Sequence, residues 1–441
     1  MSEVAAEERP AVRSADGPSA EDLMRCVHCG FCLNYCPIYL ELGMETDSPR
    51  GRIHLIRALS EGRVGPTRSL LAHLDLCLQC RACQASCPSG VSYGRIMEAA
   101  RAQVLTSAGR PLSWRLRALV LRQLLPHQRR LRLLASALRL YQRSGLQALL
   151  RRSKVLRLLP GGLADLENAL PTIPPHFFEG KAVLAEPAGN PSRTVGLLTG
   201  CVMPVLYPHT HEATVRVLAR NGCRVVAPPG QVCCGALNLH AGDLETTRRL
   251  ARRNIDAFLE AGVDAVITNS AGCGAAMKEY GELLADDPEY AEKARRFAGM
   301  VRDITEYVVE LPFKEGLRPL PQRVTYQDPC HLAHAQGIKR QPRAILAAIP
   351  ELELVEMDGA DRCCGSGGIY SVVQREMSAQ LLENKMRAVA ATGAGVIATA
   401  NPGCAMQLEA GLRRHRLEGR VVYVVELLDE AYQAAEERQA P

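Results

Sequence analysis

The chain has 441 residues, of which 47% are hydrophobic and 23% charged, and this composition excludes a disordered or collagen-like chain. A single core stops growing at roughly 250–300 residues, so two or three domains are expected. Aromatic residues make up only 4%, which argues against a stacking platform for single-stranded nucleic acid, and no nucleic-acid partner is expected. The net charge is +6, yet residues 99–164 carry 13 Arg, one Lys and no acidic residue, so the remainder is mildly acidic.

The absence of targeting and membrane-spanning patterns, together with the 17 cysteines, indicates the cellular compartment. No run of about 18 uncharged apolar residues is present, so no membrane-spanning helix is expected. Residues 1–20 are polar and predict a flexible tail, not a signal peptide. We therefore expect a cytoplasmic protein, with peripheral contact at the inner face of the membrane left open. Cysteines in that compartment indicate metal or redox chemistry more than disulfides.

Residues 21–98 contain two runs with the spacing C-x2-C-x2-C-x3-C-P. Three closely spaced thiolates can hold one face of a [4Fe-4S] cluster, and the fourth cysteine ligates the neighbouring cluster. We assign the first cluster to Cys26, Cys29, Cys32 and Cys87, and the second to Cys77, Cys80, Cys83 and Cys36. Structural zinc is the alternative, but zinc sites typically use two C-x2-C pairs without a distal Cys-Pro.

The insert between the two runs predicts a helix that begins at Ser48-Pro49, because Ser is a favoured N-cap and Pro fits the first turn. We expect a helical, enlarged two-cluster ferredoxin domain. Arg25, His28 and Arg52 could raise the reduction potential of a nearby cluster through charge or hydrogen bonds. The alternative is that these side chains are solvated at the surface.

The basic stretch, residues 99–160, interleaves Leu with Arg and is broken by Pro126, which predicts two amphipathic helices. Leu116, Leu119, Val120 and Leu124 share one predicted face. Three interpretations stay open: contact with anionic lipid, an interface with an acidic partner, or a cap packed on the ferredoxin domain. Residues 161–192 are rich in Gly and Pro and predict a linker.

Residues 193–310 and 321–432 are two copies of one module. Cys201, the pair Cys233-Cys234 and Cys273 in the first copy match Cys330, the pair Cys363-Cys364 and Cys404 in the second. The spacing from the first cysteine to the pair is 32 residues in one copy and 33 in the other. Cys223 has no counterpart and is expected to be a buried, inert thiol.

Apolar runs in the modules predict strands that alternate with helices, and hence α/β units with parallel sheets. Loops after such strands meet at one edge of the sheet, so the four cysteines of each module should converge. The expected helices are 212–221 and 244–260, and the expected strands are 194–198, 223–227, 265–268, 324–327, 352–355 and 395–399.

What the modules hold is left open between further Fe-S clusters, zinc or nothing, and a redox-active disulfide. Gly235 and Gly365 would allow the backbone to approach a cluster, and Asn269 and Asn401 could donate hydrogen bonds to sulfur. His331, next to Cys330, is a candidate ligand or proton donor against the alternative of an ordinary loop histidine. The same alternatives apply to four more histidines: His209, His211, His240 and His334.

No site for hydride chemistry is evident. The segment from Gly365 to Tyr370 contains Gly367 and Gly368 but lacks the third glycine of a dinucleotide motif, and no P-loop occurs. We therefore expect no FAD or NAD in this chain and no catalytic residues of its own. A flavin-bearing partner is implied.

Three stretches resemble the iron–sulfur subunits of bacterial glycolate oxidase: those from Arg25 to Cys32, from Ser48 to Ile53, and from Cys83 to Val91. The Cys-Cys-Gly modules are similar to the wider family that includes the cysteine-rich subunit of heterodisulfide reductase and the small subunit of anaerobic glycerol-3-phosphate dehydrogenase. The likeness extends from residue 21 to about residue 432. Modules of the heterodisulfide reductase type usually end in C-x2-C, whereas Cys273 and Cys404 lack the second cysteine.

The resemblance implies an electron-transfer subunit of a 2-hydroxy-acid dehydrogenase, with glycolate as the expected substrate. A partner FAD subunit would oxidise the acid, and this chain would pass electrons to a downstream acceptor, expected to be quinone. The alternatives are a subunit of a lactate, glycerol-3-phosphate or heterodisulfide-type oxidoreductase, or a thiol-based redox sensor.

Overall fold

The computed structural model describes residues 16–106, 112–153, 167 and 170–436. Contacts divide the chain into two units. Unit 1 comprises residues 1–122 together with 237–247, and unit 2 comprises residues 123–236 and 248–441. Most of the predicted tail, residues 1–15, and residues 161–166 and 168–169 of the predicted linker lie outside the described residues. None of the described helices is long and apolar enough to cross a membrane.

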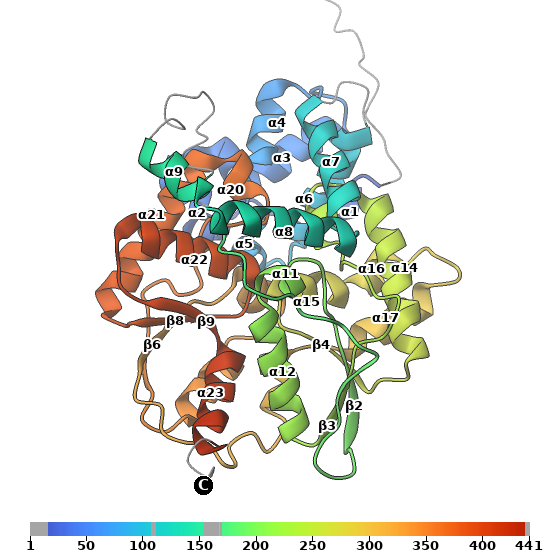
Figure 1. The fold of residues 1–441 in the computed structure, drawn as a ribbon. Helices are drawn as coiled ribbons and strands as arrows, with labels where there is room; N and C mark the ends of the chain where they lie inside the picture. The colour runs from blue at the N-terminus through green and yellow to red at the C-terminus, as the bar shows by residue number, and fades with distance from the viewer. Residues whose placement is uncertain (1–15, 107–111, 154–166, 168–169, 437–441) are drawn as a thin grey trace, which may run out of the picture. The chain divides into compact units, whose positions relative to one another are not determined.

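Unit 1 is built from short helices (Figure 1). They are α1 (Ala20–Met24), η1 (Phe31–Tyr35), α2 (Pro37–Leu42), η2 (Glu45–Asp47), α3 (Pro49–Ser60), α4 (Arg68–Asp75), α5 (Ala82–Ala85), α6 (Tyr93–Thr106), α7 (Leu112–Leu124) and α13 (Ala236–His240). The Ser48 hydroxyl accepts a hydrogen bond from the Gly51 amide at 2.9 Å, which confirms the predicted start of α3. The core of the unit gathers Ile53, Ile56, Leu74, Ile96 and Met97.

Helix α7 packs on unit 1 through a face other than the one that carries Leu116, Leu119 and Val120. These three side chains are 59%, 53% and 49% exposed, so they do not form the packed face of a cap on the ferredoxin domain. The buried side of α7 carries Trp114, whose indole N–H donates to Asp75 at 2.9 Å. Leu and Val occur almost all round this helix, so hydrophobic periodicity alone cannot select the face that packs.

The rest of the basic stretch forms helices α8 (Gln128–Arg143) and α9 (Leu146–Ser153) in unit 2. The prediction of two helices after residue 110 is therefore wrong, since the described part of this stretch already forms three, α7, α8 and α9. The additional break falls at Gly145, which takes the left-handed backbone (φ +82°) that glycine accepts readily.

Unit 2 contains two sheets with matching strand order (Figure 1). The first is β1-β3-β2-β4-β5, with β1 (Val183–Ala185), β2 (Arg193–Leu197), β3 (Cys223–Val226), β4 (Ala265–Thr268) and β5 (Val301–Asp303). The second is β7-β6-β8-β9, with β6 (Arg323–Tyr326), β7 (Glu353–Val355), β8 (Val396–Thr399) and β9 (Arg420–Tyr423). All pairs are parallel except β1 with β3, so β1 is an added edge strand from the segment expected to be linker.

Helices connect these strands as expected for α/β modules. In the first module they are α11 (Met203–Leu206), α12 (Pro208–Arg220), α14 (Leu244–Glu260), α15 (Ala271–Lys278), α16 (Tyr280–Leu283), α17 (Ala291–Met300) and α18 (Ile304–Val308). In the second they are η4 (His331–Ala335), α19 (Arg340–Ala348), α20 (Tyr370–Val373), α21 (Arg375–Thr392), α22 (Pro402–His415) and α23 (Val424–Glu436).

The two modules share one core within unit 2. Buried residues of both sheets, among them Val195, Ile267, Val324 and Ala398, belong to a single hydrophobic cluster. Helices α12 and α23 lie side by side (Figure 1), and Arg216 on α12 pairs with Asp429 on α23 at 2.7 Å. The modules therefore form one body, not two independently folded repeats.

Candidate metal centres

The two cysteine runs of unit 1 have the same unusual backbone. His28 and Gln79, each directly before the second cysteine of its run, both have φ of 54°. Gly30 and Arg81, each directly after that cysteine, have φ of 83° and 61°. Residues other than glycine rarely adopt a positive φ, and the backbone strain that this conformation causes concentrates at functional sites. In the second run the turn brings the Gln79 amide to within 3.4 Å of Cys77 Sγ as a donor.

The second predicted set of ligands is brought together around one small cavity. Cys36, Cys77, Cys80 and Cys83 line it, although Cys36 lies about 40 residues before the other three in the sequence. All four are buried. The cavity therefore combines three cysteines of one run with the distal cysteine of the other, which is the geometry that the crossed spacing predicts.

The first predicted set lies nearer the surface. Cys26, Cys32 and Cys87 are half-buried and pack against the core of unit 1, whereas Cys29 is exposed. Several large apolar side chains in and beside this run are also exposed: Met24, Val27, Phe31, Tyr35, Leu40 and Met44. The two sets thus differ in their access to solvent.

Arg52 is the cation of the buried cavity. It is 1% exposed and lines the cavity, its Nε donates to the His73 carbonyl at 2.7 Å, and its Nη2 pairs with Asp47 at 3.3 Å. Burial lowers the pKa of Arg52, but Tyr93, the neighbouring thiols and Asp47 raise it overall. Arg52 therefore stays charged beside the cysteines. Arg25, in contrast, is exposed and pairs with Glu21.

Arg81 is a second buried cation at this cavity that sequence analysis missed. It pairs with Glu98 at 3.1 Å, and Glu98 contacts His240 Nδ1 at 3.0 Å, all within unit 1. His240 therefore contacts a buried carboxylate through Nδ1 and is not a ligand candidate. Arg81 lies inside the second run, so only its place between Cys80 and Cys83 could have indicated it.

In the first module the cysteines follow the carboxyl ends of three parallel strands. Cys201 follows β2, Cys233-Cys234 follow β3, and Cys273 lies in the first turn of α15 after β4. Cys233 accepts hydrogen bonds from the thiols of Cys201 and Cys234, which lower its pKa well below the usual range. Cys234 also contacts Cys273. The convergence that the topology predicts is therefore present.

The second module repeats this arrangement with Cys330 after β6, Cys363-Cys364 after β7, and Cys404 in the first turn of α22. Here Cys364 accepts hydrogen bonds from Cys363 and Cys404, which lower its pKa, and the charge of Lys385 adds to the effect. Asn401 Nδ2 donates to Cys404 Sγ at 3.6 Å.

Of the two asparagines expected to donate to sulfur, only Asn401 does so. Asn269 Nδ2 instead donates to His211 Nδ1 at 3.0 Å, and His211 Nε2 donates to the Thr199 carbonyl at 2.9 Å. Burial lowers the pKa of His211 to about 4, so this histidine is a neutral structural bridge. Asn401 Oδ1 accepts from the Gly272 amide at 3.2 Å, and this bond joins the cysteine loops of the two modules.

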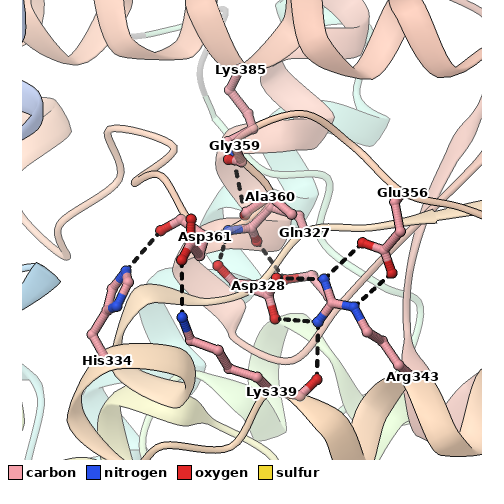
Figure 2. Close-up of polar contacts among 11 residues, drawn as sticks. Gln327, Asp328, His334, Lys339, Arg343, Glu356, Gly359, Ala360, Asp361 and Lys385 are labelled. Carbon is pink, nitrogen blue, oxygen red and sulfur yellow. Dashed lines mark hydrogen bonds and ion pairs between the residues drawn. The ribbon is translucent and has the colours of Figure 1, made fainter. Parts of the chain in front are cut away.

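The other histidine candidates also have ordinary partners. His334 Nε2 donates to the Asp361 carbonyl at 3.0 Å, and burial lowers its pKa (Figure 2). His209 contacts Glu426 at 3.4 Å. His331 lies at the junction of the modules, where its Nδ1 would be 3.8 Å from a Cβ placed on Gly272.

Fe-S clusters fit these donor sets. Cysteine thiolates hold such clusters, and each set offers four cysteines with buried or half-buried sulfur, Cys29 excepted. Across the described ranges, no three His, Cys, Asp or Glu side chains are close enough together to hold a single metal ion, so the fit rests on the cavity and on the converging thiols.

Comparisons with known proteins agree with this arrangement. Residues 22–91 match a 4Fe-4S dicluster domain, residues 195–278 and 324–409 match a cysteine-rich domain, and residues 115–170 match the linker region of the glycolate oxidase iron-sulfur subunit. A Lactate utilization protein A of Bacillus subtilis is 30% identical over 53% of this chain and 98% of that protein.

Two relatives match over nearly their whole length. The probable glycolate oxidase iron-sulfur subunit of Bacillus subtilis is 44% identical over 93% of this chain and 94% of that protein. The glycolate oxidase iron-sulfur subunit of Escherichia coli is 35% identical over 92% of this chain and 95% of that protein. With its dicluster domain, linker and two cysteine-rich modules in the same order, the chain belongs to the family of glycolate oxidase iron–sulfur subunits.

Proposed function

We propose that this chain carries electrons out of a 2-hydroxy-acid dehydrogenase complex whose substrate is glycolate. The observation that carries the proposal is the gathering of Cys36 with Cys77, Cys80 and Cys83 around one buried cavity. Such a set supplies the four thiolates that a [4Fe-4S] cluster needs. The two relatives that match over nearly their whole length are named as glycolate oxidase subunits, which supports glycolate as the substrate and a complex as the setting.

The residues around the proposed ligands hold and tune the clusters. A bound cluster supplies one-electron transfer, and the protein supplies shielding and charge. Arg52 and Arg81 place positive charge at the cavity of the second set, and the left-handed turns at His28 and Gln79 fix the backbone beside the first two cysteines of each run. We assign further clusters to the two cysteine-rich modules.

The FAD-bearing partner subunit is proposed to dock at the first cluster. Cys29 is exposed, and exposed apolar side chains such as Val27, Phe31 and Leu40 surround this run. Exposed apolar patches of this kind mark protein interaction sites. The second set is buried, so electrons from a partner would enter at the first set.

The downstream acceptor is proposed to be a membrane quinone, reached through α8 and α9. Leu133, Leu134 and Leu140 are exposed on α8 beside arginines, as is Leu149 on α9. This combination suits the surface of an anionic bilayer. Co-sedimentation with vesicles tests it. Binding to vesicles that contain anionic lipid, weakened in L133E/L140E, is expected; equal binding of both chains would contradict the lipid contact.

The substrate is tested on the native, co-purified complex. Glycolate, lactate or glycerol 3-phosphate is added without oxygen, and the broad Fe-S absorption is followed. Rapid bleaching by glycolate alone is expected. Bleaching by lactate or glycerol 3-phosphate instead would reassign the substrate. No bleaching by any of them, with clusters intact, would favour disulfide chemistry or a redox sensor.

A further inference from the structure

The two cysteine-rich modules differ at one buried position beside their cysteine pairs. Helices α14 and α21 each follow the Cys-Cys-Gly segment of their module. Asn254 is the eleventh residue of α14, and Lys385 is the eleventh residue of α21. These two residues therefore occupy equivalent places in the repeat, one neutral and one cationic.

In the first module this position holds Asn254, whose neutral side-chain amide forms hydrogen bonds to the backbone. Asn254 is fully buried. Its Oδ1 accepts from the Val232 amide at 2.8 Å, and its Nδ2 donates to the Cys233 carbonyl at 3.2 Å. Asn254 thus holds the chain at the cysteine pair without adding a charge.

In the second module Lys385 reaches toward the corresponding loop. Figure 2 shows its side chain directed at the loop of Gly359 and Ala360. Its Nζ donates to the Gly359 carbonyl at 2.8 Å and to the Ala360 carbonyl at 3.1 Å. The side chain is 3% exposed, so water does not screen its charge.

No described carboxylate forms an ion pair with Lys385. The charge of Asp328 raises the pKa of Lys385, but both terminal nitrogens of Arg343 bind Asp328 at 2.8 Å. Arg343 also pairs with Glu356 (Figure 2). Among the described residues Lys385 makes no salt bridge. Burial lowers the pKa of Lys385, and the neighbouring cysteines raise it, first among them Cys364, the thiol whose own pKa is lowered.

We propose that Lys385 is a fixed positive charge that makes the cluster of the second module easier to reduce than the cluster of the first, so that electrons collect in the second module. A nearby positive charge stabilises the added electron of a reduced cluster. With clusters bound, one electron would leave the donor cluster and enter the cluster that Cys330, Cys363, Cys364 and Cys404 would hold. The inference rests on the proposed function, because it needs clusters in both modules.

The test is an anaerobic redox titration of the cluster-loaded full chain, followed by electron paramagnetic resonance. K385Q removes the charge and keeps a hydrogen-bond donor. We expect the reduced-to-oxidised ratio of one cluster, measured at its wild-type midpoint, to fall about tenfold, which is a shift of about 59 mV for one electron. K385R should restore the midpoint. As the control, K339Q makes the same change at an exposed lysine that pairs with Asp361, and it should leave the midpoint potential of every cluster unchanged.

A second measurement leaves Lys385 in place, in case K385Q does not fold. In separate chains, C364S should remove the signal with the higher midpoint of the two modules, and C234S the signal with the lower one. The reverse order, or unchanged midpoints in loaded K385Q, would overturn the role of Lys385 alone. An iron content of only about eight atoms per chain, which two [4Fe-4S] clusters account for, would overturn the module clusters as well.

Discussion

The eight cysteines of unit 1 and the eight candidate ligand cysteines of the modules reach their sites by different routes. In unit 1 each run places three cysteines within seven residues, and local left-handed turns at His28 and Gln79 orient them. In the modules, cysteines more than 30 residues apart meet only because parallel strands end at the same edge of a sheet. The first kind of site depends on local backbone, and the second on the complete fold.

This difference predicts how far the effect of a ligand substitution extends. Loss of one ligand in unit 1 should affect only its own cluster, because short loops hold the other cysteines. The modules share one hydrophobic core and a hydrogen bond from the Gly272 amide to Asn401, so disturbance of one module should reach the other.

The largest effect is expected for C80S. Cys80 is a buried member of the cavity set, and a serine there would remove one of four ligands. Iron should fall by about four atoms per chain, and turnover with glycolate should be abolished. Iron analysis and acceptor reduction by the complex measure both. Intact turnover would contradict the role of this set.

C364S should remove iron from the second module while the unit 1 signals persist. Cys364 is the thiol that accepts hydrogen bonds from Cys363 and Cys404. The matched control is C223S, because Cys223 is equally buried but has no counterpart in the repeat. Iron content and paramagnetic signals of the two chains give the comparison. Equal iron in C364S and the wild type would argue against a module cluster.

R52M should destabilise unit 1 more than any exposed arginine change. Arg52 pairs with Asp47 where both are buried, and breaking such a pair costs about 3–5 kcal/mol. The control R57M removes an exposed pair with Glu61, which is worth about 0–1 kcal/mol. Denaturant unfolding of the loaded chain, followed through unit 1 absorbance, compares them. Similar midpoints for both variants would show that Arg52 is not a structural cation.

The smallest effect is expected in the pH dependence of the free energy of unfolding, in which Asp303 of the first module differs from its counterpart in the second. Asp303 ends β5 and Tyr423 ends β9, and each backbone amide donates to a glutamate three residues later. Burial raises the pKa of Asp303 from 3.8 to about 6. The folded state therefore holds this proton more tightly, so stability from this group is present below pH 3.8 and is lost as pH rises toward about 6.

D303N cannot lose that proton, so its stability should change less between about pH 4 and 6 than that of the wild type. The difference should approach about 2 kcal/mol across the window, since one pKa unit corresponds to about 1.4 kcal/mol. Unfolding curves at several pH values measure it. Parallel stability profiles for the two chains would show that Asp303 is ionised in the fold.

Much of the fold could be predicted because its signals are local. The helix 244–260 and the strand 265–268 were predicted at the bounds that the structure has, and the other predicted strands match within about one residue. The edge strands β5 and β9 were missed. Strand β1 was hidden in a Gly- and Pro-rich segment.

The candidate sites show the same limit. Spacing alone grouped Cys36 with Cys77, Cys80 and Cys83, which line one cavity, and the grouping of the first set stays a prediction. Spacing could not find the buried cations Arg81 and Lys385. Their importance depends on tertiary burial next to sulfur, and an arginine or lysine in a helix or loop is usually solvated. The bond that joins the modules, from Gly272 to Asn401, also depends on tertiary packing that a repeat pattern does not encode.

The most direct test of the account is freeze-quench paramagnetic resonance of the native complex mixed anaerobically with glycolate. Electron transfer from the partner flavin into this chain predicts that signals of reduced Fe-S clusters appear within one turnover, before any acceptor is added. Reduced flavin with all Fe-S clusters still oxidised would contradict the claim that this chain carries the electrons onward.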